Sequence, residues 1–240
     1  MRSITACLDN IHQPWPHTQL KGFCITNLDL ECIREGPLES LLSRTPSVKK
    51  LKWPWLHDDN EQSPNDTPIV DLNQMLKSLD QIRDTLEDLT IIAETLTPCE
   101  VEAFFVFQGS SLNLRDFHRL KHLEVPLPIL MTFTPNVDVR IQHLLPETLQ
   151  GLVLKDDFHP HDSRPPGGRN SVKQDLWEFP AIMDMLNSFL ETRKTTHPHL
   201  IELETDVGSM DEWRPSNWDA FTDLIPRYGM AIAFFRDRSD

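Results

Sequence analysis

The hydrophobic and polar residues of this chain follow a short motif that recurs along its length. In the segment 120–125, LKHLEV, apolar residues stand at the first, fourth and sixth positions, with polar or charged residues between them. The same spacing begins at Ile25, Val48, Leu86 and Leu149, and a degenerate copy begins at Leu200. Because strand side chains point to alternate faces, the fourth and sixth residues of each copy lie on one face. Each copy therefore predicts a β-strand with one buried face, at intervals typical of repeat proteins.

Helical patterns separate these predicted strands. The apolar residues of 72–86 recur every three or four positions and predict an amphipathic helix. Similar patterns predict one helix over 38–42 and another over 182–190. Two more helices are predicted to begin at capping residues, one after Thr97-Pro98 and one after Ser216. Residues 3–8 and 230–235 predict a further strand near each end of the sequence. Strands that alternate with helices indicate a parallel sheet whose connections contain the helices.

The residues between the apolar positions distinguish among the folds that alternate strands and helices. In closed barrels and doubly wound sheets both faces are covered, and the strands are continuous Val/Ile/Leu runs. Here Lys50, Lys52 and Glu124 occupy the second face, where a lone charge would be costly if it were covered. We therefore predict an α/β fold, a right-handed leucine-rich-repeat solenoid with the parallel sheet on its concave side and irregular helices on its convex side.

The same pattern sets the domain organisation. Residues 1–240 are predicted to form a single leucine-rich-repeat-like domain. Residues 57–68 and 156–174 are polar, contain proline and show no hydrophobic period, so both are predicted to be loop insertions.

The charge and the cysteines narrow the expected partners and location. The formal net charge of −14 disfavours nucleic acid and anionic membranes, because both would be repelled, and leaves a protein with a basic surface as the expected partner. The four cysteines form no CxxC pair and are interpreted as reduced, buried thiols: Cys7, Cys24, Cys32 and Cys99. No apolar run approaches the roughly 20 residues that span a bilayer, and no signal peptide is recognisable. The expected location is the cytoplasm or the nucleus.

The solvated face of the predicted sheet is the candidate binding site. Its side chains would form a mixed stripe of charges, acidic at both ends, that fits an extended basic segment or a folded partner. The predicted partner-binding residues are Asp29, Lys50, Lys52, Asp88, Thr90, His122, Glu124, Lys155, Glu202 and Glu204. No catalytic, cofactor-binding or metal-ligating residue is predicted, since no GxSxG, HExxH or phosphate-binding glycine motif occurs.

One loop supplies an alternative interpretation. Residues 156–162, DDFHPHD, place His159 and His161 among three aspartates, and imidazole and carboxylate groups are ordinary ligands of zinc or manganese. A metal-dependent enzyme is therefore the alternative function. The cluster lies in a nonperiodic loop and has no identifiable distant ligand, so a solvated loop without a metal or cofactor is the expectation.

The later copies of the motif resemble a known family. LKHLEVPLPILM, IQHLLPETLQGLVLKDD and HPHLIELETDV are similar to the leucine-rich-repeat region of fungal F-box-type proteins. A phrase of that group, LP-x-x-L-x-x-L-x-L-x-D-D, stands here from Leu145 to Asp157. The resemblance covers most of the chain and is clearest from about residue 86 onward. It implies a noncatalytic recognition module, often the part of a cullin-type ubiquitin ligase that selects the substrate.

The resemblance does not extend to the F-box itself, a helical segment that precedes the repeats. The residues before Ile25 contain two prolines around Trp15 and no helical stripe. A ubiquitin-ligase adaptor is therefore an expected partner only if an F-box precedes this sequence, and a truncated gene product without function is a further alternative.

Overall fold

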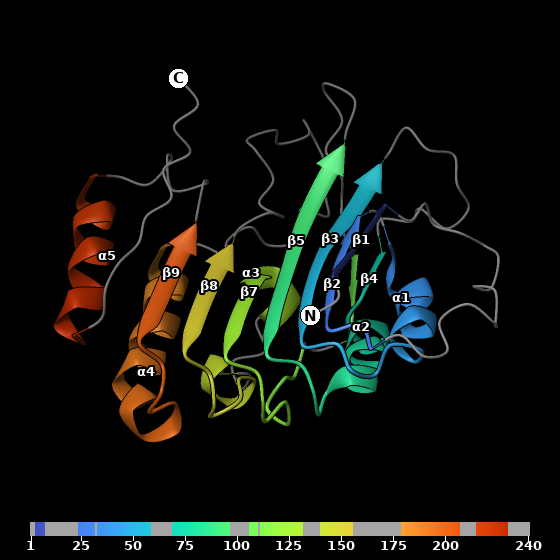
Figure 1. Ribbon diagram of the computed structural model, residues 1–240. Coiled ribbons are helices and arrows are strands. Elements are labelled where there is room, and N and C mark those ends of the chain that lie inside the picture. The colour runs from blue at the N-terminus through green and yellow to red at the C-terminus, as the bar shows by residue number, and fades with distance from the viewer. Residues whose placement is uncertain are drawn as a thin grey trace, which may run out of the picture.

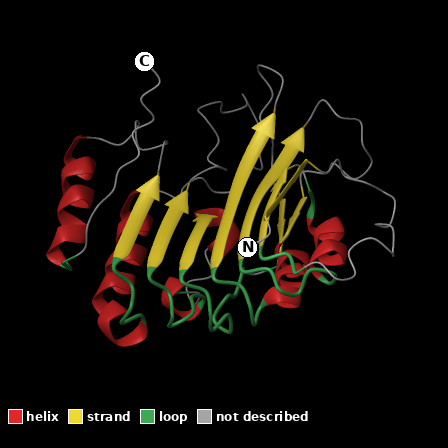
Figure 2. Cartoon of the chain, viewed as in Figure 1, coloured by secondary structure: helices red, strands yellow, loops and turns green. Residues whose placement is uncertain are grey.

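The computed structural model describes residues 3–7, 24–31, 33–58, 69–96, 106–109, 111–131, 140–155, 179–206 and 215–229. Within these ranges, seven strands form one open sheet in the order β1-β2-β3-β5-β7-β8-β9, and every neighbouring pair is parallel (Figures 1 and 2). The strands are β1 (Ser3–Cys7), β2 (Asn27–Glu31), β3 (Lys50–Asp58), β5 (Asp88–Leu96), β7 (His122–Pro126), β8 (Gly151–Lys155) and β9 (Glu202–Asp206). Their order in the sheet follows their order in the chain, and β1 and β9 are the outermost of the described strands.

The remaining elements are helices and one small sheet. The helices are α1 (Glu35–Leu42), α2 (Leu72–Leu79), α3 (Leu127–Met131), α4 (Phe179–Thr196) and α5 (Pro215–Arg227), and two short 3-10 turns are η1 (Asp80–Ile82) and η2 (Ile141–His143). β4 (Ile69–Asp71) and β6 (Val106–Gln108) pair in parallel as a second, two-stranded sheet. The chain is thus a mixed α/β protein with an open parallel sheet.

The recurring apolar positions form the core of the sheet, as predicted. The fourth residues of the six motif copies are neighbours across successive strands, and each is at most 4% exposed: Leu28, Leu51, Leu89, Leu123, Leu152 and Leu203. The sixth residues form a second buried row, which ends in a polar residue, Thr205. The first residue of each copy is also buried. Burying each leucine-sized side chain contributes about 1.5–3 kcal/mol, so neighbouring strands stabilise one another.

Helices cover the face of the sheet into which these rows point. Leu38 and Leu42 of α1, Met75 of α2, and Leu186 and Phe189 of α4 belong to the same hydrophobic core as the leucine rows. None of the described helices crosses the other face of the sheet in Figure 2. The described part of the chain therefore has two layers, helices on one side and a solvated sheet surface on the other.

A repeated hydrogen-bond pattern leads the chain into each strand. The backbone carbonyl of the motif's second residue accepts N–H groups from two consecutive residues of the next copy, at 2.7–3.2 Å. The accepting residues are Thr26, Lys49, Glu87, Lys121 and Gln150. The motif copies are therefore equivalent in backbone geometry although their spacing in the sequence is irregular.

The helix predicted over 72–86 is shorter than expected. The Asp71 side chain caps its start by accepting from the Gln74 N–H (3.0 Å), but α2 ends at Leu79 and is followed by η1. The prediction of one continuous helix was wrong because Leu86 belongs to the next motif copy. The Thr85 hydroxyl donates to the Val48 carbonyl (2.7 Å) and fixes the turn into β5.

Other predictions have mixed outcomes. The helices predicted over 38–42 and 182–190 and after Ser216 are confirmed as α1, α4 and α5, and the strand predicted over 3–8 is confirmed as β1. Residues 57 and 58, assigned to the first insertion, are the last residues of β3. The predicted helix after Thr97, the strand over 230–235 and the insertion 156–174 lie outside the described residues. None of the described helices has both the length and the apolar character that crossing a bilayer requires.

Candidate functional site

All of the predicted partner-binding residues lie on the solvated face of the sheet. One row across the strands contains Asn27, Lys50, Asp88, His122, Gly151 and Glu202, and the next contains Asp29, Lys52, Thr90, Glu124, Val153 and Glu204. Lys155 stands two residues beyond Val153 on β8. We refer to these two rows together with Lys155 as the open face. The period of two along each strand gathers side chains from six strands onto one surface.

The open face is accessible to solvent to different degrees. Lys50, Lys52, His122 and Glu202 are exposed. The other predicted residues are half-buried because the side chains of neighbouring strands, which lie about 4.8 Å apart, shield one another. No described helix covers them (Figure 2).

Ion pairs between adjacent strands organise this surface. Lys52 Nζ lies 4.0 Å from Asp29 Oδ1 of the neighbouring strand, and Lys50 pairs with Asp88. Asp88 also lies 4.0 Å from His122 Nε2. The charges of three neighbouring strands, β3, β5 and β7, are therefore connected along one row.

A second set of contacts connects β5, β7 and β8. Lys155 Nζ lies 3.2 Å from Glu124 Oε1, and the Thr90 hydroxyl donates to Glu124 Oε2 at 3.5 Å. Such partly exposed pairs each stabilise a fold by only about 1 kcal/mol. Their main effect is to hold charged side chains in defined positions on the open face.

The balance of charge differs along the open face. From β2 to β8 the predicted residues include three lysines and three carboxylates, which cancel. On β9 the predicted residues are two carboxylates, Glu202 and Glu204. At the β2 end the predicted residue Asp29 lies opposite Lys52, which balances its charge. The net negative charge of the predicted residues lies at β9.

Gly151 is a feature of the open face that the motif analysis missed. A Cβ atom placed on Gly151 would lie 2.9 Å from His122 Nδ1 and 3.5 Å from Glu202 Oε2. The side chains of His122 and Glu202 thus converge over this glycine from the strands on either side. The signal was a glycine at an outward strand position, which often marks the close approach of another group.

The proposed metal loop and the cysteines can be placed only in part. Residues 156–162 lie outside the described residues. Within the described ranges, no three histidine, cysteine, aspartate or glutamate side chains are grouped closely enough to hold a metal ion. The interpretation of Cys24 as a buried thiol was wrong, since Cys24 is an exposed free thiol.

The open face therefore presents ordered, ion-paired side chains and a net acidic end at β9. Protein-family models, curated proteins and solved structures were compared with the chain, and none of them matches it.

Proposed function

We propose that this chain is a noncatalytic protein-interaction module, built as a right-handed leucine-rich-repeat solenoid, that binds a protein partner with a basic surface on its open face. The observation that carries the proposal is a sheet whose described helices all pack on one face, while its other face holds ordered charges and is acidic at β9. No step of the proposal requires a cofactor.

Three features of the backbone support a solenoid. The strand order follows the chain without reversal, whereas a doubly wound sheet reverses direction at a switch point. The six fourth-position leucines stand in one row across the sheet. The same paired hydrogen bonds to one carbonyl join successive units. Stacked, equivalent units that bury a shared core are the defining property of repeat proteins.

The arrangement of charge supports a binding role for the open face. A solvated sheet face needs polar residues, but ion pairs such as Lys155–Glu124 add little to stability. Charged side chains that are already held in place lose less freedom when a partner binds, which favours affinity. The balanced lysine and carboxylate pairs offer polar contacts, while Glu202 and Glu204 attract a cationic group at the β9 end.

The resemblance to fungal F-box repeat regions supplies the class of partner. It rests on LKHLEV and on the phrase from Leu145 to Asp157, which supplies the buried residues of β8. In this proposal the partner is a protein substrate that the module selects for ubiquitin transfer, in the cytoplasm or the nucleus. An adaptor of the ligase would bind only through an F-box located outside the present sequence.

The test is a charge reversal at the acidic end of the open face. Glu202 is exposed and makes no ion pair with any described residue, so Glu202→Lys changes the surface charge without breaking an ion pair in the described part of the chain. Asp184→Lys is the matched control, because Asp184 is exposed on α4, the helix that packs on the opposite face. Proteins captured from cell extract by the wild-type chain would be identified, and their affinities for the purified variants measured.

A partner of the open face should bind the wild type and Asp184→Lys equally well and bind Glu202→Lys at least about tenfold more weakly, as expected when an opposite charge becomes a like charge. Equal affinity of a captured partner for all three proteins would remove the β9 end from its binding site. Loss of affinity in Asp184→Lys alone would place the site on the helical side.

A further inference from the structure

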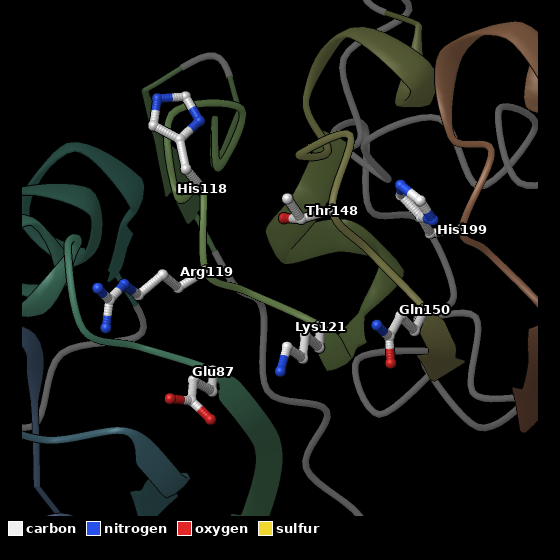
Figure 3. A pocket seen from close by; sticks show the side chains of 7 residues that line it. All are labelled: Glu87, His118, Arg119, Lys121, Thr148, Gln150 and His199. Carbon is white, nitrogen blue, oxygen red and sulfur yellow. The ribbon is translucent and has the colours of Figure 1, made fainter.

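A second candidate site lies outside the open face, where the strands begin. A hollow with a volume of about 400 Å³ is lined by residues of the turns that precede β5, β7, β8 and β9 (Figure 3). Its volume is within the range of sites for small molecules. Arg119 and Lys121 come from the turn before β7, Thr148 from the turn before β8, and His199 from the turn before β9.

Equivalent positions in the motif explain why two of these side chains are available. Thr85 and Thr148 each stand immediately before the first apolar residue of a motif copy. The hydroxyl of each donates a hydrogen bond to the backbone carbonyl of the first residue of the preceding copy. The acceptors are the Val48 carbonyl at 2.7 Å and the Leu120 carbonyl at 2.9 Å. Arg119 and His199 occupy the same position before the copies that begin at Leu120 and Leu200. Neither side chain hydrogen-bonds to a residue that the structure describes, so both remain available to a ligand.

The hollow is cationic in a chain whose net charge is −14. Among the described residues that line it, Glu87 is the single carboxylate, and Lys49 already neutralises it at 2.7 Å. This hydrogen bond from Lys49 is the main reason why the pKa of Glu87 is lowered, and the charges of Lys121 and Arg119 lower that pKa further. Arg119 and Lys121 make no ion pair within the described part of the chain. Two positive charges are therefore uncompensated.

The other lining side chains add hydrogen-bond capacity. His118 and Gln150 complete the lining, and Figure 3 shows them with Arg119, Lys121 and His199 spaced around the hollow. The lining thus holds a guanidinium, an ammonium, an amide and two imidazoles from three turns, each of which can donate a hydrogen bond. Such a set matches a compact group with several acceptor oxygens and two negative charges.

We propose that this hollow binds a phosphate monoester group. The doubly charged phosphate balances Arg119 and Lys121, and its oxygens accept hydrogen bonds from Gln150 and the two imidazoles. Phosphate is favoured over a carboxylate because a carboxylate carries one negative charge and two oxygens, which leaves one cation unmatched. The site is separate from the proposed partner surface, since it lies where the strands begin, whereas the open face is formed by outward side chains along the strands.

The test is a titration of the whole chain with inorganic phosphate at low ionic strength and pH 7.5, followed by backbone amide chemical shifts. Because the net charge of the chain repels anions, we expect weak but saturable binding with a Kd on the order of 1 mM. The shifts should be largest around residues 118–121 and 148–150. Arg119→Ala/Lys121→Ala should bind at least about tenfold more weakly. Arg115→Ala is the control, because Arg115 is exposed on the same turn and does not line the hollow.

Acetate and two peptides complete the experiment. Acetate binding as tight as phosphate binding would overturn the proposal, and so would phosphate affinity unchanged in Arg119→Ala/Lys121→Ala.

A phosphoserine peptide is compared with the same peptide carrying unmodified serine. Binding of the phosphopeptide more tightly than free phosphate supports the site and assigns it to phosphorylated proteins, whereas equal binding supports the site and assigns it to small phosphate monoesters. Thermal unfolding of each variant verifies that it is folded.

Discussion

The guanidinium carbon of Arg34 lies 4.4 Å from the centre of the Trp55 ring, so the cation stacks on the aromatic face. Glu35 joins the two residues, since its carboxylate accepts from Arg34 Nε at 3.1 Å and from Trp55 Nε1 at 2.9 Å. Arg34 also donates to the Ile69 carbonyl of β4. All three side chains are buried. This network connects the start of α1 with β3 of the main sheet and with the two-stranded sheet.

Removing the cation of this network should be strongly destabilising. In Arg34→Ala the Glu35 carboxylate stays buried without its counter-charge, and the free energy of unfolding should fall by about 3–5 kcal/mol. Arg83→Ala is the control, because Arg83 is exposed and its nearest carboxylates lie at 3.8 and 3.9 Å; it should cost less than about 1 kcal/mol. Denaturant unfolding of both variants measures the difference. Equal stabilities would show that the network does not contribute to the fold.

The leucine rows should tolerate truncation much less well than the open face. Leu152 is fully buried between Leu123 and Leu203, so Leu152→Ala leaves a cavity and should lower the free energy of unfolding by about 2–5 kcal/mol. Glu124→Ala changes an outward residue of the adjacent strand and breaks its contacts with Lys155 and Thr90, which should cost about 1 kcal/mol or less. Denaturant unfolding of the two variants provides the comparison, and a smaller loss in Leu152→Ala than in Glu124→Ala would contradict a shared core.

The predictable part of the fold is the part that depends on local periodicity. Strand side chains alternate with period two, so the buried rows and the composition of the open face follow from the positions of Leu123, Glu124 and their equivalents in each copy. The end of α2 was not predictable from its stripe, because Leu86 fits a helix and a strand motif equally well. The strand motif is selected by tertiary contacts, such as the hydrogen bond from the Thr85 hydroxyl to the Val48 carbonyl.

Contacts that depend on register or on distant segments were not predictable. The periodicity placed Lys155 on the open face, but its pairing with Glu124 depends on the alignment of β7 with β8, which connections of unequal length determine. The periodicity places Trp55 at an inward position. Its hydrogen bond to Glu35 and the hydrogen bond from Arg34 to the Ile69 carbonyl were not predictable, because they join residues far apart in sequence. No single-sequence pattern encoded β4 or β6, since each has only three residues.

Two threonines provide a matched pair of substitutions with opposite expected effects. The buried Thr205 hydroxyl ends the sixth-position row of the core and has no hydrogen-bond partner among the described residues, so Thr205→Val should raise the free energy of unfolding by about 1 kcal/mol. The Thr148 hydroxyl donates to the Leu120 carbonyl, so Thr148→Val should lower it by about 1 kcal/mol. Thermal and denaturant unfolding measure both changes. A loss of stability in Thr205→Val would show that its hydroxyl has a partner.

His197 should make the stability of the fold depend on pH. Its ring is buried, lies edge-on to Phe189 with the ring centres 5.6 Å apart, and places Nε2 3.2 Å from the Leu145 carbonyl. Burial lowers the pKa of His197 below its ordinary value of 6.5, against the opposing effects of the Leu145 carbonyl and of Glu147. The folded chain therefore keeps the neutral imidazole at pH values where the unfolded chain already binds a proton.

The sign of the effect follows from this difference in proton binding. The contribution of neutral His197 is fully present above about pH 6.5 and is lost as the pH falls toward the lowered pKa, with a slope of at most about 1.4 kcal/mol per pH unit. Glu39 and Glu87 also have lowered pKa values, and that of Glu39 is caused mainly by its hydrogen bond with Gln74. Their contributions to stability are lost in a separate pH range, below about pH 4.5. Free energies of unfolding measured from pH 7.5 to pH 5 should therefore decline in the wild type and decline less steeply in His197→Gln. The comparison uses slopes, because the substitution itself also changes stability at every pH. Parallel slopes in the two proteins would mean that His197 does not resist protonation in the folded chain.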